Sequence, residues 1–237
     1  MLKNFYLFIV LLLIASKILS QNTVEYYLKT GNDKHETGDY KAAIKDYNKA
    51  LILDTNNTEI YYFRANAKFE MTDYEDAIKD YSKIIEINPD YIDAYYNRAN
   101  AYYELQNYEA AIKDFDKTLE IDATYYDSYF DRANAKFNLG KFNEAINDFS
   151  KGLNYNKEYA DGYFDRANAY FRISDFENAI IDYTKAIELK DDIYDYYFNR
   201  ALSKFNLELN DEACSDLEKA KKLGDPDANE YINELCN

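Results

Sequence analysis

Arginine and aspartate each recur in this 237-residue sequence at places 34 residues apart, and together they can form ion pairs. Five successive repeats carry the arginine, and all six carry the aspartate. A charge that lies in a packed helical interface needs a partner, so the two columns predict a buried ladder of Arg–Asp pairs. The predicted ladder consists of Arg64, Arg98, Arg132, Arg166, Arg200, Asp80, Asp114, Asp148, Asp182 and Asp216. Two questions stay open: the arginines could instead line an anion site, and each pair could lie within one repeat or between two.

The sequence offers no constellation of residues for catalysis. His35 is the only histidine, and it stands where other repeats carry an aromatic residue, so it is expected to substitute for an aromatic side chain rather than act as a base or ligand. The sequence contains no glycine-rich phosphate loop, no His/Cys metal spacing and no nucleophile elbow. We therefore expect no catalytic residue, no metal site, no cofactor and no enzymatic activity.

The 34-residue period also defines the elements that position these side chains. Six repeats follow one another from Val24 without insertion or deletion. Within each repeat, large and small apolar residues alternate twice at i, i+4 and i+7 spacing, which predicts two amphipathic helices separated by turn-forming clusters. A helix pair of this size cannot bury its apolar face alone, so stacked repeats must supply the core. The repeats are 24–57, 58–91, 92–125, 126–159, 160–193 and 194–227.

The repeats resemble the tetratricopeptide repeat (TPR), as in YYNRANAYY from Tyr95 and YEAAI from Tyr108. The resemblance covers nearly all of the chain after its first 23 residues. It implies an all-α fold, a right-handed α-solenoid (superhelix) of helix-turn-helix repeats. It also implies that the first helices line a concave groove, which in this family usually binds extended peptides or partner helices. The arginines depart from the family pattern, because they stand where leucine is usual.

The second, fifth, ninth and twelfth places of each first helix share one face, which is the candidate groove. Asparagine has a low helix propensity, so a column of it inside helices suggests that the amides are used. The amides could clamp the backbone of an extended partner, or they could hydrogen-bond between neighbouring helices while the aromatic residues pack there. The predicted partner-binding residues are Asn32, Asn66, Asn100, Asn134, Asn168, Tyr62, Tyr96, Phe130, Phe164 and Phe198.

The two cysteines, Cys214 and Cys236, flank the last turn of the chain. Residues 228–237 are predicted to form a C-terminal capping helix, because the last repeat would otherwise expose an apolar face. Gly224 centres the turn, ten residues after Cys214 and twelve before Cys236, so the cysteines should lie at similar heights in an antiparallel helix pair. This spacing predicts a disulfide. The alternative is two buried free thiols, because Cys214 replaces an isoleucine of other repeats.

Residues 1–20 differ from the rest of the chain. Lys3 precedes an apolar run from Phe5 to Ala15, which is signal-peptide anatomy, and removal is expected near Ser20. The run is too short for a membrane span of about 20 apolar residues, although an uncleaved anchor remains the alternative. We therefore expect an exported protein, periplasmic or secreted, where conditions favour a disulfide.

The chain is strongly acidic, with a formal net charge of −16. Removal of two lysines and no acids with residues 1–20 would make this −18. Such a charge disfavours nucleic acid and anionic membranes as partners, and no membrane insertion is expected after signal removal. The sequence predicts a non-enzymatic scaffold that binds a protein or an extended peptide, neutral or basic, through its groove. The alternative is a structural subunit of an envelope or cell-surface assembly.

Overall fold

The computed structural model describes residues 23–236. The predicted signal peptide, residues 1–20, lies outside this range. All regular elements of residues 23–236 are helices, which confirms the all-α fold class. None of the helices in the described range is both long and apolar enough to cross a membrane.

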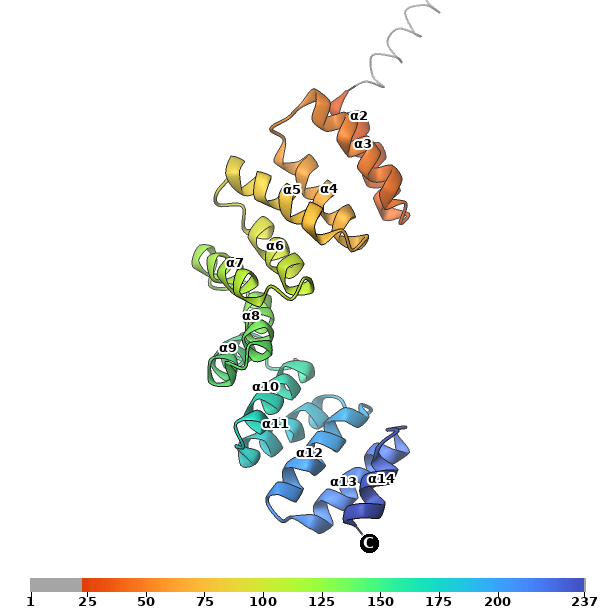
Figure 1. Ribbon diagram of the computed structural model, residues 1–237, viewed down its shortest axis with the longest axis vertical. Coiled ribbons are helices and arrows are strands. Elements are labelled where there is room, and N and C mark those ends of the chain that lie inside the picture. The colour runs from red at the N-terminus through yellow and green to blue at the C-terminus, as the bar shows by residue number, and fades with distance from the viewer. Residues whose placement is uncertain (1–22, 237) are drawn as a thin grey trace, which may run out of the picture. The chain divides into compact units, whose positions relative to one another are not determined.

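Each of the six repeats contains one pair of helices, and a single helix follows the last pair (Figure 1). In the five pairs other than the third, the turn is short and the two helices pack against each other in antiparallel orientation. The pairs are α2 (Val24–Glu36) with α3 (Tyr40–Leu53), α4 (Thr58–Glu70) with α5 (Tyr74–Ile87), α6 (Ile92–Glu104) with α7 (Tyr108–Ile121), α8 (Asp127–Asn138) with α9 (Phe142–Tyr155), α10 (Ala160–Arg172) with α11 (Phe176–Leu189), and α12 (Tyr194–Asn206) with α13 (Asn210–Lys222). The last helix is α14 (Ala228–Leu235).

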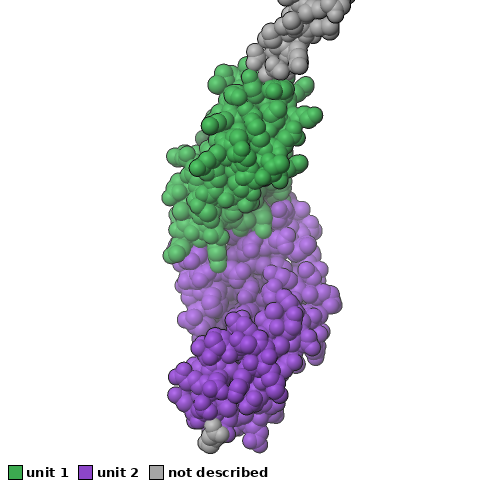
Figure 2. Space-filling model, turned by 90° about the vertical axis from the view of Figure 1, so that its right-hand side faces the viewer, with its two compact units in different colours: residues 1–107 green, residues 108–237 purple. Residues whose placement is uncertain are grey.

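The chain divides into two compact units, residues 1–107 and residues 108–237 (Figure 2). Unit 1 holds α2 to α6, and unit 2 holds α7 to α14. Inside each unit, a second helix packs against both its own first helix and the first helix of the next pair. The first helices also touch one another, α2 with α4 in unit 1 and α10 with both α8 and α12 in unit 2. Within each unit, we call the surface formed by the second, fifth, ninth and twelfth places of these helices the first-helix face of that unit.

The core of each repeat is an alternation of large and small buried side chains. Tyr47 on α3 is 0% exposed, and a Cβ atom at Gly31 of α2 would come within 2.5 Å of its ring. In unit 2, Phe149 on α9 is also 0% exposed and packs with Ala133 of α8. Burial of a side chain of this size contributes roughly 2–3 kcal/mol. The small residue therefore sets how closely the two helices approach.

The turn inside each repeat contains one residue in the left-handed region, with φ between 58° and 79°. Its N–H bonds to the carbonyl three residues earlier, as from Thr72 to Phe69 at 2.8 Å. The next N–H bonds five residues back, from Asp73 to Lys68 at 2.9 Å. This Schellman motif satisfies the last carbonyls of the first helix and turns the chain within three residues. The left-handed residues are Gly38, Thr72, Gln106, Gly140, Ser174 and Glu208.

Candidate functional site

The arginine and aspartate columns meet in four described ion pairs. In each pair, Nε and Nη2 of the arginine donate to the two carboxylate oxygens of an aspartate 16 residues later, at 2.6–2.8 Å. The aspartates are buried, with 1–5% of their surface exposed. Every one of these pairs lies within a single repeat. The pairs are Arg64–Asp80, Arg132–Asp148, Arg166–Asp182 and Arg200–Asp216. Arg98 lies in unit 1 and Asp114 in unit 2, and their pairing stays a prediction.

The same arginines also reach back to the preceding repeat. Nη1 donates to a polar side chain 16 residues earlier, at 2.5–3.0 Å. The acceptors form a column that the sequence reasoning missed, although its 34-residue spacing was a signal for it. They are Asn48, Ser82, Asp116, Ser150 and Thr184. Because Nε, Nη1 and Nη2 all donate to protein groups in the four described pairs, those arginines have few donors left for an external anion.

Lysines contribute a second cation to some of the aspartates. In each case the lysine lies four residues after the arginine, and its Nζ lies 2.7–2.9 Å from the carboxylate. These contacts are Lys68 with Asp80, Lys136 with Asp148 and Lys204 with Asp216. The fifth repeat has Tyr170 at the lysine place, so Arg166 is the only cation paired with Asp182 among the described ion pairs.

The first repeat uses lysines because Thr30 stands at the arginine place. Lys34 contacts the Asp46 carboxylate, and Lys49 Nζ lies 2.9 Å from it. Burial alone would raise the pKa of Asp46, but hydrogen bonds from Lys34, Lys49 and Thr30 outweigh burial and lower that pKa. The carboxylate therefore stays ionised in its buried place. For Arg166, burial opposes the charge but the contact with Asp182 prevails and raises the guanidinium pKa.

The asparagine column divides into two classes. In three repeats a buried tyrosine of the second helix donates its hydroxyl to the asparagine Oδ1, at 2.6–2.8 Å. These contacts are Tyr47 to Asn32, Tyr81 to Asn66 and Tyr183 to Asn168. The corresponding second-helix residues for Asn100 and Asn134 are Phe115 and Phe149, which have no hydroxyl. Within residues 23–236, the side-chain amides of Asn100 and Asn134 have no protein partner. The helix-to-helix alternative therefore describes three asparagines and leaves two uncommitted.

The aromatic column is used mainly for packing, and Phe130 is its most buried member. Phe130 is only 6% exposed and belongs to the core of unit 2. Its ring occupies the space left by two glycines, because a Cβ atom at Gly152 or Gly162 would approach it within 2.7 Å and 2.8 Å respectively. Those glycines are the signal that sequence reasoning missed. Phe130 therefore offers little surface to a partner.

The remaining aromatic residues of the column are partly buried against neighbouring rings. Phe164 lies 4.9 Å from Tyr196 between ring centroids, and Phe198 lies 5.0 Å from Tyr231 of the capping helix. The ring centroids of Tyr62 and Tyr81 lie 6.5 Å apart. Tyr96 is also half-buried. These rings are therefore partly packed against other rings and expose only part of their surface on the first-helix face.

A cavity of about 260 Å³ opens on the first-helix face of unit 1. Its walls come from α2, α4, α5 and α6. Asn66 and Asn100 of the predicted column line it, together with Tyr62. The cavity therefore brings together three of the predicted groove residues. His35 also lines it.

Two carboxyl groups of α10 interact in unit 2: Asp161 lies on the first-helix face, and Asp165 lies at the sixth place of the repeat. Burial, and secondly the charge of Asp161, raise the pKa of Asp165 to about 7. The Tyr196 hydroxyl donates to Asp161. Burial, followed by the contact with Asp161, raises the pKa of Tyr196 above its usual value. Burial and the neighbouring charge therefore favour the protonated form of Asp165.

The described residues contain no group of three or more His, Cys, Asp or Glu that could hold a metal ion. His35 takes the expected aromatic place, since its ring lies 5.1 Å from Tyr40 at 69°. The equivalent pair Phe69 and Tyr74 has the same 5.1 Å separation at 68°. The histidine therefore substitutes for an aromatic side chain in shape.

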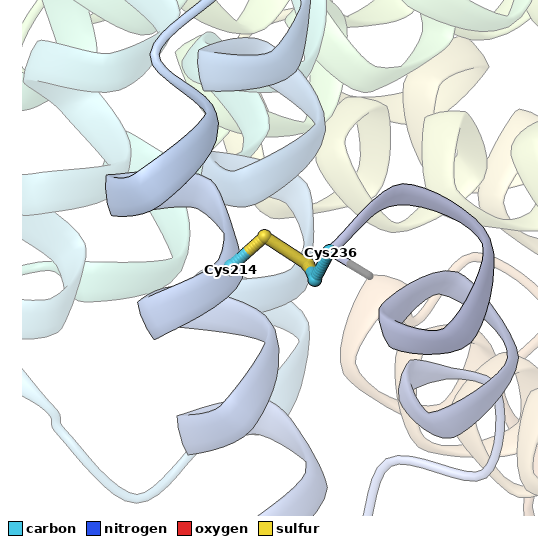
Figure 3. The surroundings of a disulfide bond; sticks show 2 residues. All are labelled: Cys214 and Cys236. Carbon is cyan, nitrogen blue, oxygen red and sulfur yellow. A yellow bond between two sulfur atoms is a disulfide. The ribbon is translucent and has the colours of Figure 1, made fainter.

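The disulfide predicted at the C-terminus is present in the structure (Figure 3). Sγ of Cys214 on α13 is bonded to Sγ of Cys236, directly after α14, with Cα atoms 5.8 Å apart. Ala228, Tyr231 and Ile232 of α14 lie in the core clusters of the last repeat. The capping helix is thus held by both apolar packing and a covalent bond.

Comparison with protein families gives matches over most of these repeats. The tetratricopeptide repeat model matches residues 92–125 and 160–192, and a second TPR repeat model matches residues 31–72, 65–106 and 133–174. The chain belongs to the tetratricopeptide-repeat family. TPR proteins are typically protein-interaction scaffolds, because stacked repeats create extended binding surfaces. Members of the family are generally non-catalytic. A search of curated protein sequences finds no significant match.

Solved TPR structures share this fold. The C-terminal part of a TPR repeat-containing protein from Cytophaga hutchinsonii is 22% identical, with a TM-score of 0.75 over 87% of this chain and 83% of that one. YrrB, described as a TPR protein with an unusual peptide-binding site, is 19% identical, with a TM-score of 0.71 over 80% of this chain and 98% of its own. MamA is 24% identical, with a TM-score of 0.68 over 73% and 94%. At these identities the likeness concerns the fold alone.

Proposed function

We propose that this TPR protein is a non-enzymatic scaffold that acts outside the cytoplasm and binds extended, neutral or basic segments of a partner on the first-helix faces of its units. The observation that carries the proposal is the state of Asn100 and Asn134. Each amide lies half-buried in a helix interior, where asparagine is unfavourable, and neither has a protein partner among the described residues. Each offers both N–H donors and a carbonyl acceptor, which together complement the groups of a peptide backbone.

The charge of the first-helix face supports a neutral or basic partner. The second place of every first helix is acidic, so this face repels negative charge. An acidic segment would add to this repulsion, whereas a basic one would relieve it. The acidic places are Glu25, Glu59, Asp93, Asp127, Asp161 and Asp195.

Two features support action outside the cytoplasm. The first is the leader-like sequence of residues 1–20. The second is the Cys214–Cys236 disulfide, since disulfides persist in oxidising compartments. The test is to express the chain with its leader and sequence the N-terminus of the recovered protein. An intact Met1 on protein found only in the cytoplasm would contradict export.

The binding test compares variants that lack the asparagine amides with a variant in which a new tyrosine hydroxyl bonds to one of them. Asn100→Ala with Asn134→Ala removes both free amides, and Phe149→Tyr adds the hydroxyl that would donate to Asn134, as Tyr47 donates to Asn32. Both changes should weaken the binding of unstructured peptides, the first by about tenfold. Fluorescence anisotropy with labelled neutral, basic and acidic peptides measures this.

Asn168→Ala is the matched control for this binding test, because the Oδ1 of Asn168 is already committed to Tyr183. It should lower stability more than affinity. Equal affinities for wild type and the double variant would contradict the amide clamp. Recovery of the protein only within a large insoluble envelope assembly, with no peptide binding, would favour a structural subunit instead.

A further inference from the structure

The cavity of unit 1 combines aromatic walls with polar groups that have unused hydrogen-bonding capacity. Its aromatic walls are Tyr62, Phe69 and Tyr81. Tyr81 donates to Asn66 Oδ1 at 2.6 Å, and Asn97 Nδ2 donates to the Tyr62 hydroxyl at 3.2 Å. These bonds hold the wall residues in place. A preorganised polar wall of this kind lowers the cost of ordering a bound side chain.

His35 is the exceptional residue of this cavity. Four repeats, including the first, pair the aromatic residue of this place with a second ring at 5.1–5.4 Å and 68–70°, so a phenylalanine would satisfy the packing at His35. The histidine instead brings a nitrogen, Nε2, which is buried and has no hydrogen-bond partner. A buried polar atom without a partner destabilises the fold, because its lost hydration is not replaced. Comparison with the other repeats therefore separates two roles of His35: its ring is needed for packing, whereas its Nε2 is not.

The charges around the cavity select the chemistry of its occupant. Glu70 and Asn100 complete the polar lining, and the lining residues include no lysine or arginine. An anionic side chain would face Glu70 without a countercharge. A purely apolar side chain would leave His35 Nε2 and the Asn100 amide without partners. A cation meets both a carboxylate and the faces of aromatic rings, which attract positive charge.

We propose that this cavity binds the side chain of a lysine or arginine from an extended partner segment. The charged group lies between the Glu70 carboxylate and the rings of Tyr62 and Phe69, and one of its N–H groups donates to His35 Nε2. Asn100, whose amide is free, holds the adjacent backbone of the segment. The inference rests on the proposed function, which it narrows to segments with a basic residue at one defined place.

The single histidine makes the cavity directly observable by NMR. His35 gives the only imidazole C–H signals of the chain, so they need no further assignment. The probes are lysine and arginine with both termini blocked as amides, and the same derivatives of norleucine, glutamine and glutamate. The two basic probes should shift the His35 signals saturably, with a Kd on the order of millimolar. No saturable shift, or equal shifts from the norleucine or glutamine probes, would overturn the proposal.

Two variants separate the roles of the carboxylate and the imidazole. Glu70→Gln should weaken the lysine probe by about fivefold. Glu75→Gln on α5 removes an exposed carboxylate outside the cavity and should have no effect. His35→Phe restores the aromatic residue of the other repeats, so it should fold normally and lose about fivefold affinity for a labelled lysine-containing peptide. Unchanged lysine affinity in Glu70→Gln would refute the assignment.

The outcomes distinguish the cavity from the scaffold function. If extended peptides bind in a way that depends on Asn100 and Asn134 but show no preference for lysine or arginine, the cavity assignment fails and the scaffold function stands. If the blocked lysine shifts His35 while no extended peptide binds, the cavity assignment stands and the scaffold function fails.

Discussion

At the scale of single residues, the arginine fork is the feature that most clearly links sequence to stability. Each described fork neutralises a buried carboxylate of its own repeat and also donates to the repeat before. An isolated buried carboxylate is costly, because its hydration is lost. The number of cations around each aspartate therefore predicts how much the loss of one arginine costs.

Arg166→Ala should destabilise the protein more than Arg132→Ala. Asp182 loses its only described cation in the first variant, whereas Asp148 keeps Lys136 at 2.7 Å in the second. We expect a loss of about 3–5 kcal/mol for Arg166→Ala, and a smaller loss for Arg132→Ala. Urea unfolding measures both. Equal losses would show that Lys136 does not compensate for the missing arginine, and no loss for Arg166→Ala would show that Asp182 does not depend on Arg166.

Asp165 should make unit 2 less stable as pH rises. Its pKa is about 7 in the folded protein, because burial and then Asp161 disfavour the carboxylate, but about 4 in the unfolded chain. The folded state therefore binds an extra proton between these values, and the free energy of unfolding falls from pH 4 towards pH 7. Asp165→Asn should raise this free energy by about 1–2 kcal/mol at pH 8, after discounting for partial exposure, and change it little at pH 4.

Thermal unfolding across this pH range measures the effect of Asp165. Glu218→Gln removes an exposed carboxylate of the same unit and serves as the control. Parallel pH profiles for wild type and Asp165→Asn would show that Asp165 titrates normally.

The sequence predicted which residue types form the columns, but the contacts of each member depend on its neighbours. The asparagine column is uniform in sequence, yet its amides divide according to whether the second helix carries tyrosine or phenylalanine. Asn32 is committed because residue 47 has a hydroxyl, and Asn134 is free because residue 149 has none. Both partners were visible in the sequence, but their contact required the packing of two helices.

At the scale of elements, every turn inside a repeat uses the same left-handed residue place, whatever residue occupies it. Glycine reaches this region without cost, but a β-branched residue at positive φ is strained. Thr72, at φ 60°, is the clearest case. The Schellman hydrogen bonds and the packing of α4 on α5 hold it there.

Thr72→Gly should stabilise unit 1 by about 1 kcal/mol, because it releases backbone strain. Gly38 has φ 79°, and a Cβ atom there would meet no other atom within 4 Å, so Gly38→Thr should cost a similar amount through the backbone alone. Chemical unfolding of the two variants measures both changes. A destabilised Thr72→Gly would show that the threonine side chain outweighs the strain.

Element boundaries followed from the period, whereas residue exposure within a helix did not. The first helices begin at or within one residue of the predicted repeat starts. Phe130 shares its place with Tyr62 and Phe164, yet Gly152 and Gly162 let its ring enter the core. Periodicity gives the average environment of a column, and one small neighbour on another helix changes it.

At the scale of the whole molecule, the ends of a helical array are its least stable parts, because a terminal repeat has no neighbour to cover its apolar face. The C-terminal end is covered by α14, whose Tyr231 ring packs against Phe198. Cys214 and Cys236 fix this helix covalently. A crosslink of this separation, 22 residues, contributes about 3 kcal/mol in the chain-entropy account.

Cys214→Ser with Cys236→Ser should therefore lower the free energy of unfolding by about 3 kcal/mol, and amide exchange should accelerate first in α14 and α13. Wild type in reductant should behave like the variant. The variant itself should not respond to reductant. Two reactive thiols per chain in denatured, unreduced protein would contradict the disulfide.

The family, the helix pairs and the capping helix were predictable because each depends on a pattern repeated along the chain. The cavity of unit 1 was not, because it combines His35, which breaks a pattern, with residues of α4, α5 and α6. The binding proposed for this cavity therefore depends on a residue that departs from the repeat pattern. The column of side chains that accept from the arginine Nη1 was also missed, although it repeats as regularly as the ladder and could have been predicted from the sequence.

Because the arginines donate to the same place of the preceding repeat, neighbouring repeats share one type of polar contact. Arg166 and Arg200 bind hydroxyl acceptors, Ser150 and Thr184, at the same place of the preceding repeat. A 34-residue segment that is duplicated or excised in register therefore presents a matching donor and acceptor at its new junction. Such a chain can change length in evolution, or by design, without inventing a new interface.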